Sequence, residues 1–412
     1  MSAPASRLPT LDIMRGFAVM GILAMNIVAF ALPEAASLNP RAWGGDGVAD
    51  IIVWAAVFVL VDGKMRALFA MLFGASMLLA MDRAEMSGRN GRHAQYWRLG
   101  WLGVIGLAHY LLLWWGDILL LYAVVGLIGL LYTDREPVAL VKLAFIMFGL
   151  HLLVLLLSMG GLYFLDYQAN QPGASARDLA AYARVMDGLG RPGSDWIAQE
   201  LAVTRGDWTG IFATKLGALP EWLLTQVEFS LLDTLGFMLL GMAMLKSGFL
   251  TGQWQQEQYR QVMQHALRIG FVPLALLAAW VMWTGFATLP TYGTGFAWSF
   301  LFRIPLAVGY AALFGLWTLA HGGKKGMQRV KAVGQMALSN YLLSSLVMTF
   351  LFYGWGLGQF GDWPRARLYL LLPPMWLAML LWSPLWLGRF RYGPAEWLWR
   401  CLEQRRLLGL KR

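Results

Sequence analysis

Charged residues and cysteines are scarce in this sequence. Only 14% of its 412 residues are charged, against roughly 25% in a typical soluble domain. The single cysteine, Cys401, excludes an intrachain disulfide framework, and zinc clusters of the CxxC type are absent. The sequence also has no nucleotide-binding loop and no redox motif. A small disulfide-rich protein and a zinc-ribbon protein are therefore excluded.

Apolar residues, tryptophan and glycine are abundant instead. Hydrophobic residues make up 58% of the chain, which carries 21 Trp and 46 Gly. Both types are enriched in membrane proteins, Trp at the interfaces and Gly inside helices. The net charge of +10 comes from short segments between apolar runs, which is the pattern of cytoplasmic loops near anionic lipids and does not indicate nucleic-acid binding. The composition predicts an all-α polytopic membrane protein.

Ten apolar stretches are long enough to cross a bilayer, whose core needs roughly 20 helical residues. A shorter apolar run at 48–61 predicts a re-entrant or interfacial helix, and an eleventh span is the alternative. The expected fold is thus a transmembrane helical bundle of about ten spans. These run approximately over 11–32, 65–81, 98–114, 117–133, 140–165, 223–246, 265–286, 296–320, 335–355 and 367–390.

Lys and Arg gather in one alternating set of connecting segments, which includes 324–331 and the tail 389–412. The turns of the opposite set at 115–116 and 287–295 contain neither residue. Because cytoplasmic loops carry the excess of positive charge, both ends of the chain are expected in the cytoplasm. The long polar segment 166–222 then forms an extracytoplasmic loop region, since long loops translocate regardless of their charge.

This topology divides the chain into three parts. An N-terminal membrane half, 1–165, is expected to hold the candidate site; the loop region 166–222 and a C-terminal membrane half, 223–412, follow. The first span superficially resembles a signal peptide. Arg15 and Asn26 interrupt its apolar region, so we expect it to remain uncleaved.

Polar residues share one face of the first span. Asn26 follows Arg15 by eleven residues, which at 100° per residue rotates only about 20° off the same stripe, and Asp12 precedes Arg15 by one turn. Ionisable groups in spans cost about 2.5–3.5 kcal/mol each on insertion scales and so mark candidate sites. Arg15 either extends to the inner headgroups and pairs with Asp12 or contacts a ligand. Asn26 is either part of a site or a hydrogen-bonding contact between helices.

His109 and Asp117 bound the turn between the third and fourth spans. An imidazole can act as a general base or a transient acyl acceptor near neutral pH, and a carboxylate can orient it. A structural role for His109, and a simple helix-capping role for Asp117, are the alternatives. Three weaker candidates are Glu228 and Asp233 in the sixth span and Arg303 in the eighth. Arg303 could bind a phosphate or carboxylate, or pair with either acid.

Several segments together resemble the YeiB-type family of multi-pass bacterial membrane proteins, and they cover nearly the whole chain. The N-terminal run and the C-terminal signature are the most specific of them. The matching segments are Leu11-Asp12-Ile13-Met14-Arg15-Gly16-Phe17-Ala18, Gly21-Ile22-Leu23 through Asn26, Asn39-Pro40, Leu72-Phe73-Gly74-Ala75, His109 to Asp117-Ile118-Leu119, Gly334-Gln335-Met336-Ala337-Leu338-Ser339-Asn340-Tyr341-Leu342, and Gly393-Pro394-Ala395-Glu396-Trp397-Leu398-Trp399-Arg400.

This family is similar to a transmembrane acyltransferase superfamily that includes heparan-alpha-glucosaminide N-acetyltransferase and the OafA-type sugar O-acyltransferases. The resemblance implies transfer of an acyl group from a cytoplasmic donor, usually acetyl-CoA, to an acceptor on the far side of the membrane. OafA-type enzymes carry an Arg and, eleven positions later, a His on the first helix. Here Arg15 matches but position 26 is Asn, so the heparan enzyme is the closer pattern.

The leading hypothesis is therefore a membrane-bound acyltransferase with an extracytoplasmic sugar, lipid or small hydroxylated acceptor. His109 is the expected base or acyl carrier, Asp117 its partner and Asn26 a polar stabiliser. Arg15 and Asp12, with Arg303 as a further candidate, would bind the acyl-CoA donor, and no metal is expected.

The alternatives are a transporter or flippase of an anionic amphiphile, with Arg15 and Arg303 along its path, and a non-catalytic sensor or scaffold. The expected location is the bacterial cytoplasmic (inner) membrane. Membrane lipids, acyl-CoA and the acceptor are the expected partners, a homodimer is an option, and no nucleic acid is expected.

Overall fold

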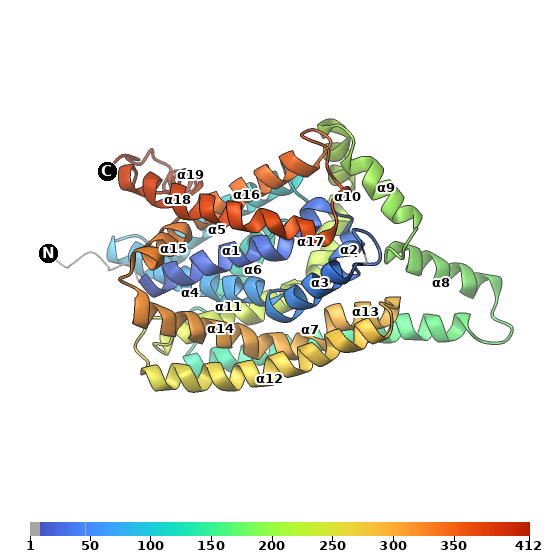
Figure 1. Ribbon diagram of the computed structural model, residues 1–412. Helices are drawn as coiled ribbons and strands as arrows, with labels where there is room; N and C mark the ends of the chain where they lie inside the picture. Colours follow the sequence, from blue (N-terminus) through green and yellow to red (C-terminus); the bar gives the residue numbers. More distant parts are fainter. Residues whose placement is uncertain (1–8, 46) are drawn as a thin grey trace.

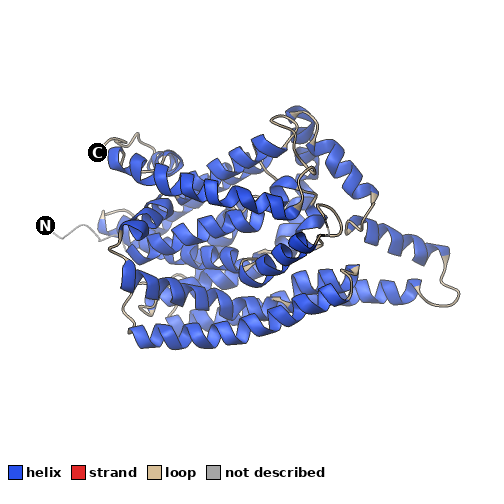
Figure 2. Ribbon diagram, viewed as in Figure 1, coloured by secondary structure: helices blue, strands red, loops and turns tan. Residues whose placement is uncertain are grey.

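The computed structural model describes residues 9–45 and 47–412, and this part of the chain consists of helices and connecting loops without a strand (Figure 2). The prediction of an all-α bundle is confirmed. The helices are α1 (Pro9–Ala31), α2 (Glu34–Leu38), α3 (Val48–Leu60), α4 (Lys64–Met86), α5 (Gly91–Leu112), α6 (Leu119–Gly129), α7 (Pro137–Ala169), α8 (Ala176–Gly188), α9 (Asp195–Thr204), α10 (Trp208–Phe229), α11 (Leu231–Lys246), α12 (Gln256–Trp283), α13 (Thr288–Gly293), α14 (Phe300–His321), α15 (Lys325–Gln335), α16 (Ala337–Phe352), α17 (Arg365–Leu368), α18 (Leu372–Arg389) and α19 (Pro394–Gln404), with short turns η1 (Leu130–Tyr132), η2 (Thr294–Trp298) and η3 (Tyr369–Leu371).

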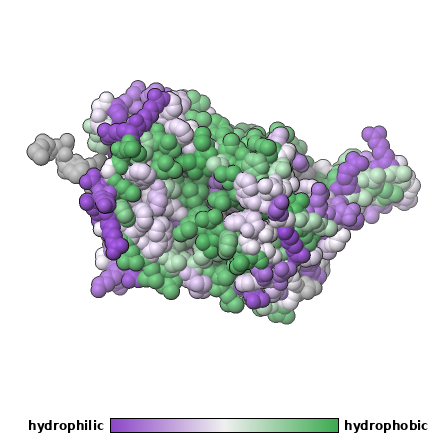
Figure 3. All heavy atoms as spheres, turned by 90° about the horizontal axis from the view of Figure 1, so that it is seen from above, coloured by the Kyte–Doolittle hydropathy of each residue, from purple (hydrophilic) through white to green (hydrophobic). Residues whose placement is uncertain are grey.

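The protein is a membrane protein by the length and composition of its helices. Five of the described helices are long and apolar enough to cross a bilayer, namely α1, α7, α12, α14 and the α17–α18 segment. The number rises to seven if the bent pairs α10–α11 and α15–α16 each form one span. In the view of Figure 3 an apolar zone separates two hydrophilic ends, as expected for a bundle that lies across a membrane.

Each of the ten predicted spans coincides with a helix, but the helices differ in length. The fourth span corresponds to an apolar helix at Leu119–Tyr132, which is shorter than the roughly 20 residues of a full crossing. A 53° bend after Phe229 interrupts the sixth predicted span, and an 80° bend after Gln335 lies at the start of the ninth. The count of ten crossings therefore stays a prediction, as does the interfacial position of the apolar run at 48–61, which forms α3.

Region 166–222, which we expected as a loop region, is largely helical. It contains the end of α7, all of α8 and α9, and most of α10. Serine and aspartate side chains begin three of these helices: Ser175, Ser194 and Asp207 each accept a hydrogen bond from a first-turn backbone N–H. These capping residues were visible in the sequence, and only the high polarity of the region suggested a loop.

The bundle has a buried centre and an apolar periphery. Helix α11 is buried along nearly its whole length, and it packs against α4 and α7. By contrast, only 28% of the apolar window of α7 and of α12 is buried, so most of their surface is free to face lipid. Figure 1 shows that the start of α1 and the C-terminal α19 lie toward the same end of the bundle, as the predicted topology requires. We call this the inner end.

Helices α1 and α15 meet at the inner end without intervening side chains. A Cβ atom on Gly334 would lie 1.8 Å from the Asp12 carbonyl oxygen, and one on Gly16 would lie 2.2 Å from the Val330 carbonyl oxygen. Only glycine fits such a close backbone approach. The contact places residues of α1 beside the bend between α15 and α16.

Candidate active site

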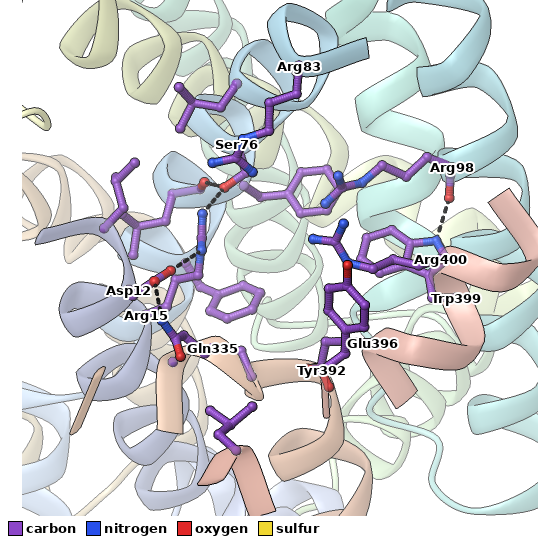
Figure 4. Close-up of a pocket in the computed structure, with 18 of the residues that line it drawn as sticks. Asp12, Arg15, Ser76, Arg83, Arg98, Gln335, Tyr392, Glu396, Trp399 and Arg400 are labelled. Atoms are coloured by element: carbon purple, nitrogen blue, oxygen red, sulfur yellow. Dashed lines mark hydrogen bonds and ion pairs between the residues drawn. The ribbon is translucent and has the colours of Figure 1, made fainter. Parts of the chain in front are cut away.

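A cavity of about 170 Å³ lies at the inner end (Figure 4). Its walls come from α1, α4, α5 and the C-terminal helices α15, α16, α18 and α19, so both membrane halves contribute. We call it the inner cavity. Five arginines line it: Arg15, Arg83, Arg98, Arg391 and Arg400.

Arg15 belongs to a hydrogen-bonded network on one wall of the inner cavity. Its guanidinium donates to Asp12 Oδ1 at 2.9 Å and to the Ser76 hydroxyl at 2.5 Å. Gln335 Nε2 donates to the other oxygen of Asp12 at 3.0 Å (Figure 4). The predicted pairing of Arg15 with Asp12 is therefore present. The same network holds Arg15 toward α4 and the cavity. Arg15 can therefore pair with Asp12 and contact a ligand in the cavity at the same time.

The opposite wall is built from α19 and the inner end of α5. The Trp399 indole N–H donates to the Arg98 carbonyl oxygen at 2.8 Å, and the Arg98 guanidinium lies 4.5 Å from the Trp399 ring centre. Arg400 similarly lies over the ring of Tyr392 at 4.9 Å. Such cation–π contacts hold a guanidinium in place without neutralising its charge.

The carboxylate of Glu396 is hydrogen-bonded to the start of α16. Its carboxylate accepts hydrogen bonds from the backbone N–H groups of Leu338 and Ser339 at 2.7 and 3.1 Å, and from the Ser339 hydroxyl at 2.5 Å. Burial raises the pKa of this carboxyl, although the hydrogen bonds oppose the shift. The bend after Gln335 exposes these N–H groups, and Glu396 satisfies them.

The charges of the inner cavity favour an anionic ligand. Five arginines face only two carboxylates, and those two, Asp12 and Glu396, already accept several hydrogen bonds. Guanidinium groups bind phosphate oxygens with geometric specificity. The arrangement therefore suits a ligand with more than one phosphate.

The second part of the candidate site is a buried pair of His109 and Asp117. His109 Nδ1 and Asp117 Oδ1 are 2.8 Å apart, and both residues are 2% exposed. The second oxygen of Asp117 accepts the backbone N–H of Leu120 at 2.7 Å, at the start of α6. Asp117 therefore both caps α6 and orients the imidazole of His109. The two alternative roles predicted for Asp117 occur together.

The imidazole of His109 has one nitrogen without a partner. Nε2 is buried and makes no hydrogen bond within the described part of the chain. In the tautomer in which Nδ1 donates to the Asp117 carboxylate, Nε2 has a lone pair without a partner. This is the arrangement of a general base.

Two tyrosines lie between the helices that build the inner cavity and the buried pair. Ala337 lines the cavity, and Tyr341 lies one turn further along α16, with its ring centre 5.0 Å from that of His109. Phe73 also lines the cavity, and its ring centre is 5.3 Å from that of Tyr122. Tyr341 therefore connects the surroundings of the cavity with His109.

A further cavity lies on the other side of the buried pair. It has a volume of about 230 Å³ and is lined by Trp115, Glu200, Lys215 and Tyr353, among others. Trp115 continues the chain from Trp114, whose ring is 6.4 Å from His109, and the two tryptophan rings are 5.8 Å apart. We call it the Trp115 cavity. Region 166–222 supplies most of the wall of the Trp115 cavity. This cavity therefore lies on the side of the buried pair that faces away from the inner end.

Two predicted site residues lie outside this arrangement. Asn26 is buried on α1, and no hydrogen bond joins its side chain to His109 or Asp117 within the described residues. Arg303 donates to Asp62 at 3.0 Å and to the Gly295 carbonyl oxygen at 2.5 Å. The proposed pairing of Arg303 with Glu228 or Asp233 is therefore wrong.

The guanidinium of Arg303 also lies beside Gly63, at the start of α4. Arg83, near the end of the same helix, lines the inner cavity. The 20 residues between these positions span about 30 Å of helix. Arg15 contacts Ser76 of α4, which follows Gly63 by 13 residues, or about 20 Å of helix, so Arg303 does not share a site with Arg15.

Comparisons with known proteins give one family. The chain is 36% identical over 413 residues to the "Uncharacterized protein YeiB" of Escherichia coli (strain K12), with 96% of each chain covered. This chain belongs to the YeiB-type family. A second member, the "Uncharacterized protein YxaH" of Bacillus subtilis (strain 168), is 28% identical over 405 residues, with 96% of this chain and 93% of YxaH covered. Residues 244–406 match the model described as "Protein of unknown function (DUF418)". No solved structure matches the chain.

Four of the seven segments that carry the YeiB-type resemblance contribute to the inner cavity. Asp12 and Arg15 come from the N-terminal run, and Phe73 comes from the motif on the second span. The C-terminal signature supplies the other side, with Gly334, Gln335, Ala337, Glu396, Trp399 and Arg400. Segments far apart in the sequence thus build one site.

Four of the five arginines were not predicted as site residues. Arg83, Arg391 and Arg400 contribute to the positive charge of the segments predicted to be cytoplasmic, and nothing in the sequence indicated that they face a common cavity. Arg98 stood at the edge of a predicted span. Their convergence depends on the packing of α19 against α5, which no local pattern reveals.

Proposed function

We propose that this YeiB-type protein is a membrane-bound acyltransferase of the bacterial cytoplasmic membrane. It takes an acyl group from a cytoplasmic acyl-CoA, with acetyl-CoA as the expected donor. It transfers this group to an extracytoplasmic sugar, lipid or small hydroxylated acceptor. The inner cavity binds phosphate groups of the donor, and the buried pair of His109 and Asp117 provides the base.

The inner cavity supports the donor side of this proposal. Coenzyme A carries several phosphates at one end and a thioester at the other, joined by a flexible arm. Five arginines suit the phosphates. The arm can then extend past Tyr122 and Tyr341 toward His109, which contacts Tyr341.

The observation that carries the proposal is the free lone pair of a buried, carboxylate-oriented imidazole. His109 Nε2 has no partner, while Nδ1 lies 2.8 Å from Asp117. A histidine with a structural role alone normally satisfies both nitrogens when buried, because an unpaired buried polar atom costs about 1–3 kcal/mol. A reacting hydroxyl would supply the missing partner.

The proposed reaction balances without a metal or redox group. His109 Nε2 takes the proton of the acceptor hydroxyl while the hydroxyl oxygen attacks the thioester carbonyl carbon. The carbon–sulfur bond breaks, and the CoA thiolate leaves with the proton that His109 returns. Asp117 holds the imidazole and stabilises its protonated form during the transfer. The chemistry rests on these two residues and needs no contact from Asn26.

A transfer assay tests this proposal. Membranes that contain the wild-type protein or the His109→Gln variant are incubated with acetyl-CoA labelled in its acetyl group and with extracytoplasmic extract. We expect label in the acceptor fraction and release of free CoA thiol with the wild-type protein only. Equal label from both proteins, or none above that of membranes without the protein, would contradict the proposal.

A further inference from the structure

A third polar cavity lies near the start of α4, at the end of the bundle opposite the inner cavity. Its volume is about 80 Å³, and residues of α1, α3, α13, α17 and the segments beside them line it. Its polar residues are Ser37, Asp62, Thr291, Arg365 and Tyr369. We call it the Arg365 cavity. The proposed acyl transfer does not use it.

Hydrogen-bonding groups without partners gather in this cavity. The Thr291 hydroxyl, the Tyr369 hydroxyl and Arg365 Nε are buried and make no hydrogen bond within the described residues. Arg365 and Thr291 are each 2% exposed. Buried polar groups are normally paired, so three orphans on one small cavity indicate a ligand that accepts hydrogen bonds.

The charge of Arg365 has no ion-pair partner within the described residues. Two carboxylates lie near it, and both have other partners. Asp62 accepts from Arg303, and Asp50 accepts the backbone N–H of Ala366 at 2.7 Å. A buried charge without a partner is costly, and one bound anion would balance that of Arg365.

The size and position of the cavity limit the ligand. A cavity of about 150 Å³ holds benzene, so about 80 Å³ accommodates a carboxylate or a phosphate group but not a whole sugar. Ser37 lines the cavity and is exposed at the surface. A group can therefore enter beside Ser37, either free or as part of a larger molecule that stays outside.

We infer that the Arg365 cavity binds a small oxyanion, a carboxylate or a phosphate group, at the end of the bundle opposite the donor site. Arg365 supplies the charge, and the hydroxyls of Thr291 and Tyr369 donate hydrogen bonds to the anion. Arg303 acts through Asp62, which it holds beside the cavity at 3.0 Å. The bound oxyanion belongs either to a soluble molecule or to an anionic lipid headgroup.

Titration of the purified full-length protein with inorganic phosphate and with acetate, at constant ionic strength, tests this inference. The variants Thr291→Val and Tyr369→Phe each remove one hydroxyl and keep the shape of the side chain. Because a hydrogen bond to a charged group is worth about 1.5–3 kcal/mol, each variant should bind the anion at least about 10-fold more weakly. Calorimetry and the melting temperature report the binding.

Two further variants identify the site. Arg365→Lys keeps the charge but loses the Nε donor, and we expect it to bind the anion more weakly. Arg365 also donates a hydrogen bond to the Ala36 carbonyl oxygen, so the lysine variant could fail to fold. In that case the two hydroxyl variants decide the test. Arg400→Gln weakens anion binding in the inner cavity only, so the binding that Thr291→Val and Tyr369→Phe weaken should remain in this variant. Loss of binding in Arg400→Gln alone would place the anion in the inner cavity and overturn the inference. Equal affinity in Thr291→Val, Tyr369→Phe and the wild type would overturn it as well.

Native mass spectrometry separates the two sources of the oxyanion. A retained anionic phospholipid that is present on the wild-type protein and lost from Tyr369→Phe would identify a headgroup. Binding of added phosphate or acetate without retained lipid would identify a soluble ligand. If neither occurs, the inference is wrong, and the acyl-transfer proposal is unaffected because this test uses no acyl-CoA.

Discussion

The inner cavity and the buried pair of His109 and Asp117 differ in their access to solvent. In the inner cavity the side chain of Arg15 is 24% exposed, whereas those of His109 and Asp117 are 1% and 0% exposed. Charges in contact with water are screened and exchange partners easily, while a dry pair keeps one geometry and interacts more strongly. The difference suggests a division of work, with ligand capture in the first region and proton transfer in the second.

This division of work between the inner cavity and the buried pair requires the two ends of the bundle to face opposite sides of the membrane. Cysteines placed at Arg89 and Ala287, both exposed, should react with a membrane-impermeant reagent from opposite sides in a Cys401→Ser background. A third cysteine at Ala183, in region 166–222, should react from the same side as Ala287. We expect an all-or-none difference in labelling. If positions 89 and 287 are both labelled from the same side, the predicted topology is wrong.

Substitution of His109 should have the largest effect on turnover. The His109→Ala variant should lose activity by at least about 100-fold, because general base catalysis typically contributes 10²–10⁴-fold. Acyl-CoA binding should stay the same, since the base acts in the transition state. Turnover and donor affinity, measured on the same preparation, check both statements.

His109→Gln is the matched control for this experiment. It retains hydrogen bonding but has no basic nitrogen, so it should be nearly as inactive as His109→Ala and close to the wild type in melting temperature. A structural histidine would give the reverse pattern, with glutamine tolerated and alanine unstable. A stable and fully active His109→Ala protein would end the proposed mechanism.

Arginine substitutions in the inner cavity should change binding and leave chemistry intact. Arg400→Gln should weaken acyl-CoA binding by about 10-fold, the scale of one charge-assisted contact, with little change in turnover at saturating donor. Arg15→Ala should weaken binding more at low salt than at high salt, because salt already screens partly exposed charges. Arg329→Gln is the control, because Arg329 lies in a segment predicted to be cytoplasmic and does not line the cavity. Equal effects of Arg400→Gln and Arg329→Gln would indicate a general effect of charge.

The smallest effect is expected at Ser76. Its hydroxyl receives a hydrogen bond from Arg15 at 2.5 Å, so Ser76→Ala removes one fixing contact and leaves the charge in place. We expect donor affinity to fall by only about 2- to 10-fold, corresponding to roughly 0.5–1.5 kcal/mol. Acyl-CoA titration checks this. A loss as large as that of Arg400→Gln would show that Ser76 contacts the donor itself.

The sequence predicted the helical class and most helix positions, because apolar runs of membrane length are a strong local signal. It also identified His109 and Asp117, which are close in the chain and meet across a short turn. It did not predict the bend after Gln335 or the helices of region 166–222, since both depend on local capping and packing that polarity and length do not report.

Contacts between distant helices were beyond the sequence for a different reason. Pairing with Glu228 or Asp233 was one of two alternatives for Arg303, but Asp233 pairs with Arg66 at 2.6 Å and Arg303 with Asp62. Any of these acids is chemically suitable, and only the packing of α4 against α11 and α14 selects between them. The same holds for the arginines that α19 brings to the inner cavity.

The central claim is that the donor binds at one end of the bundle and the acceptor receives the acyl group at the other. Sealed vesicles of one orientation, with labelled acetyl-CoA added on the side of the inner cavity and acceptor enclosed on the other side, test it directly. We predict that label reaches the enclosed acceptor while the CoA stays outside, and that His109→Gln abolishes this transfer. Label that appears only when donor and acceptor share one side would contradict the account.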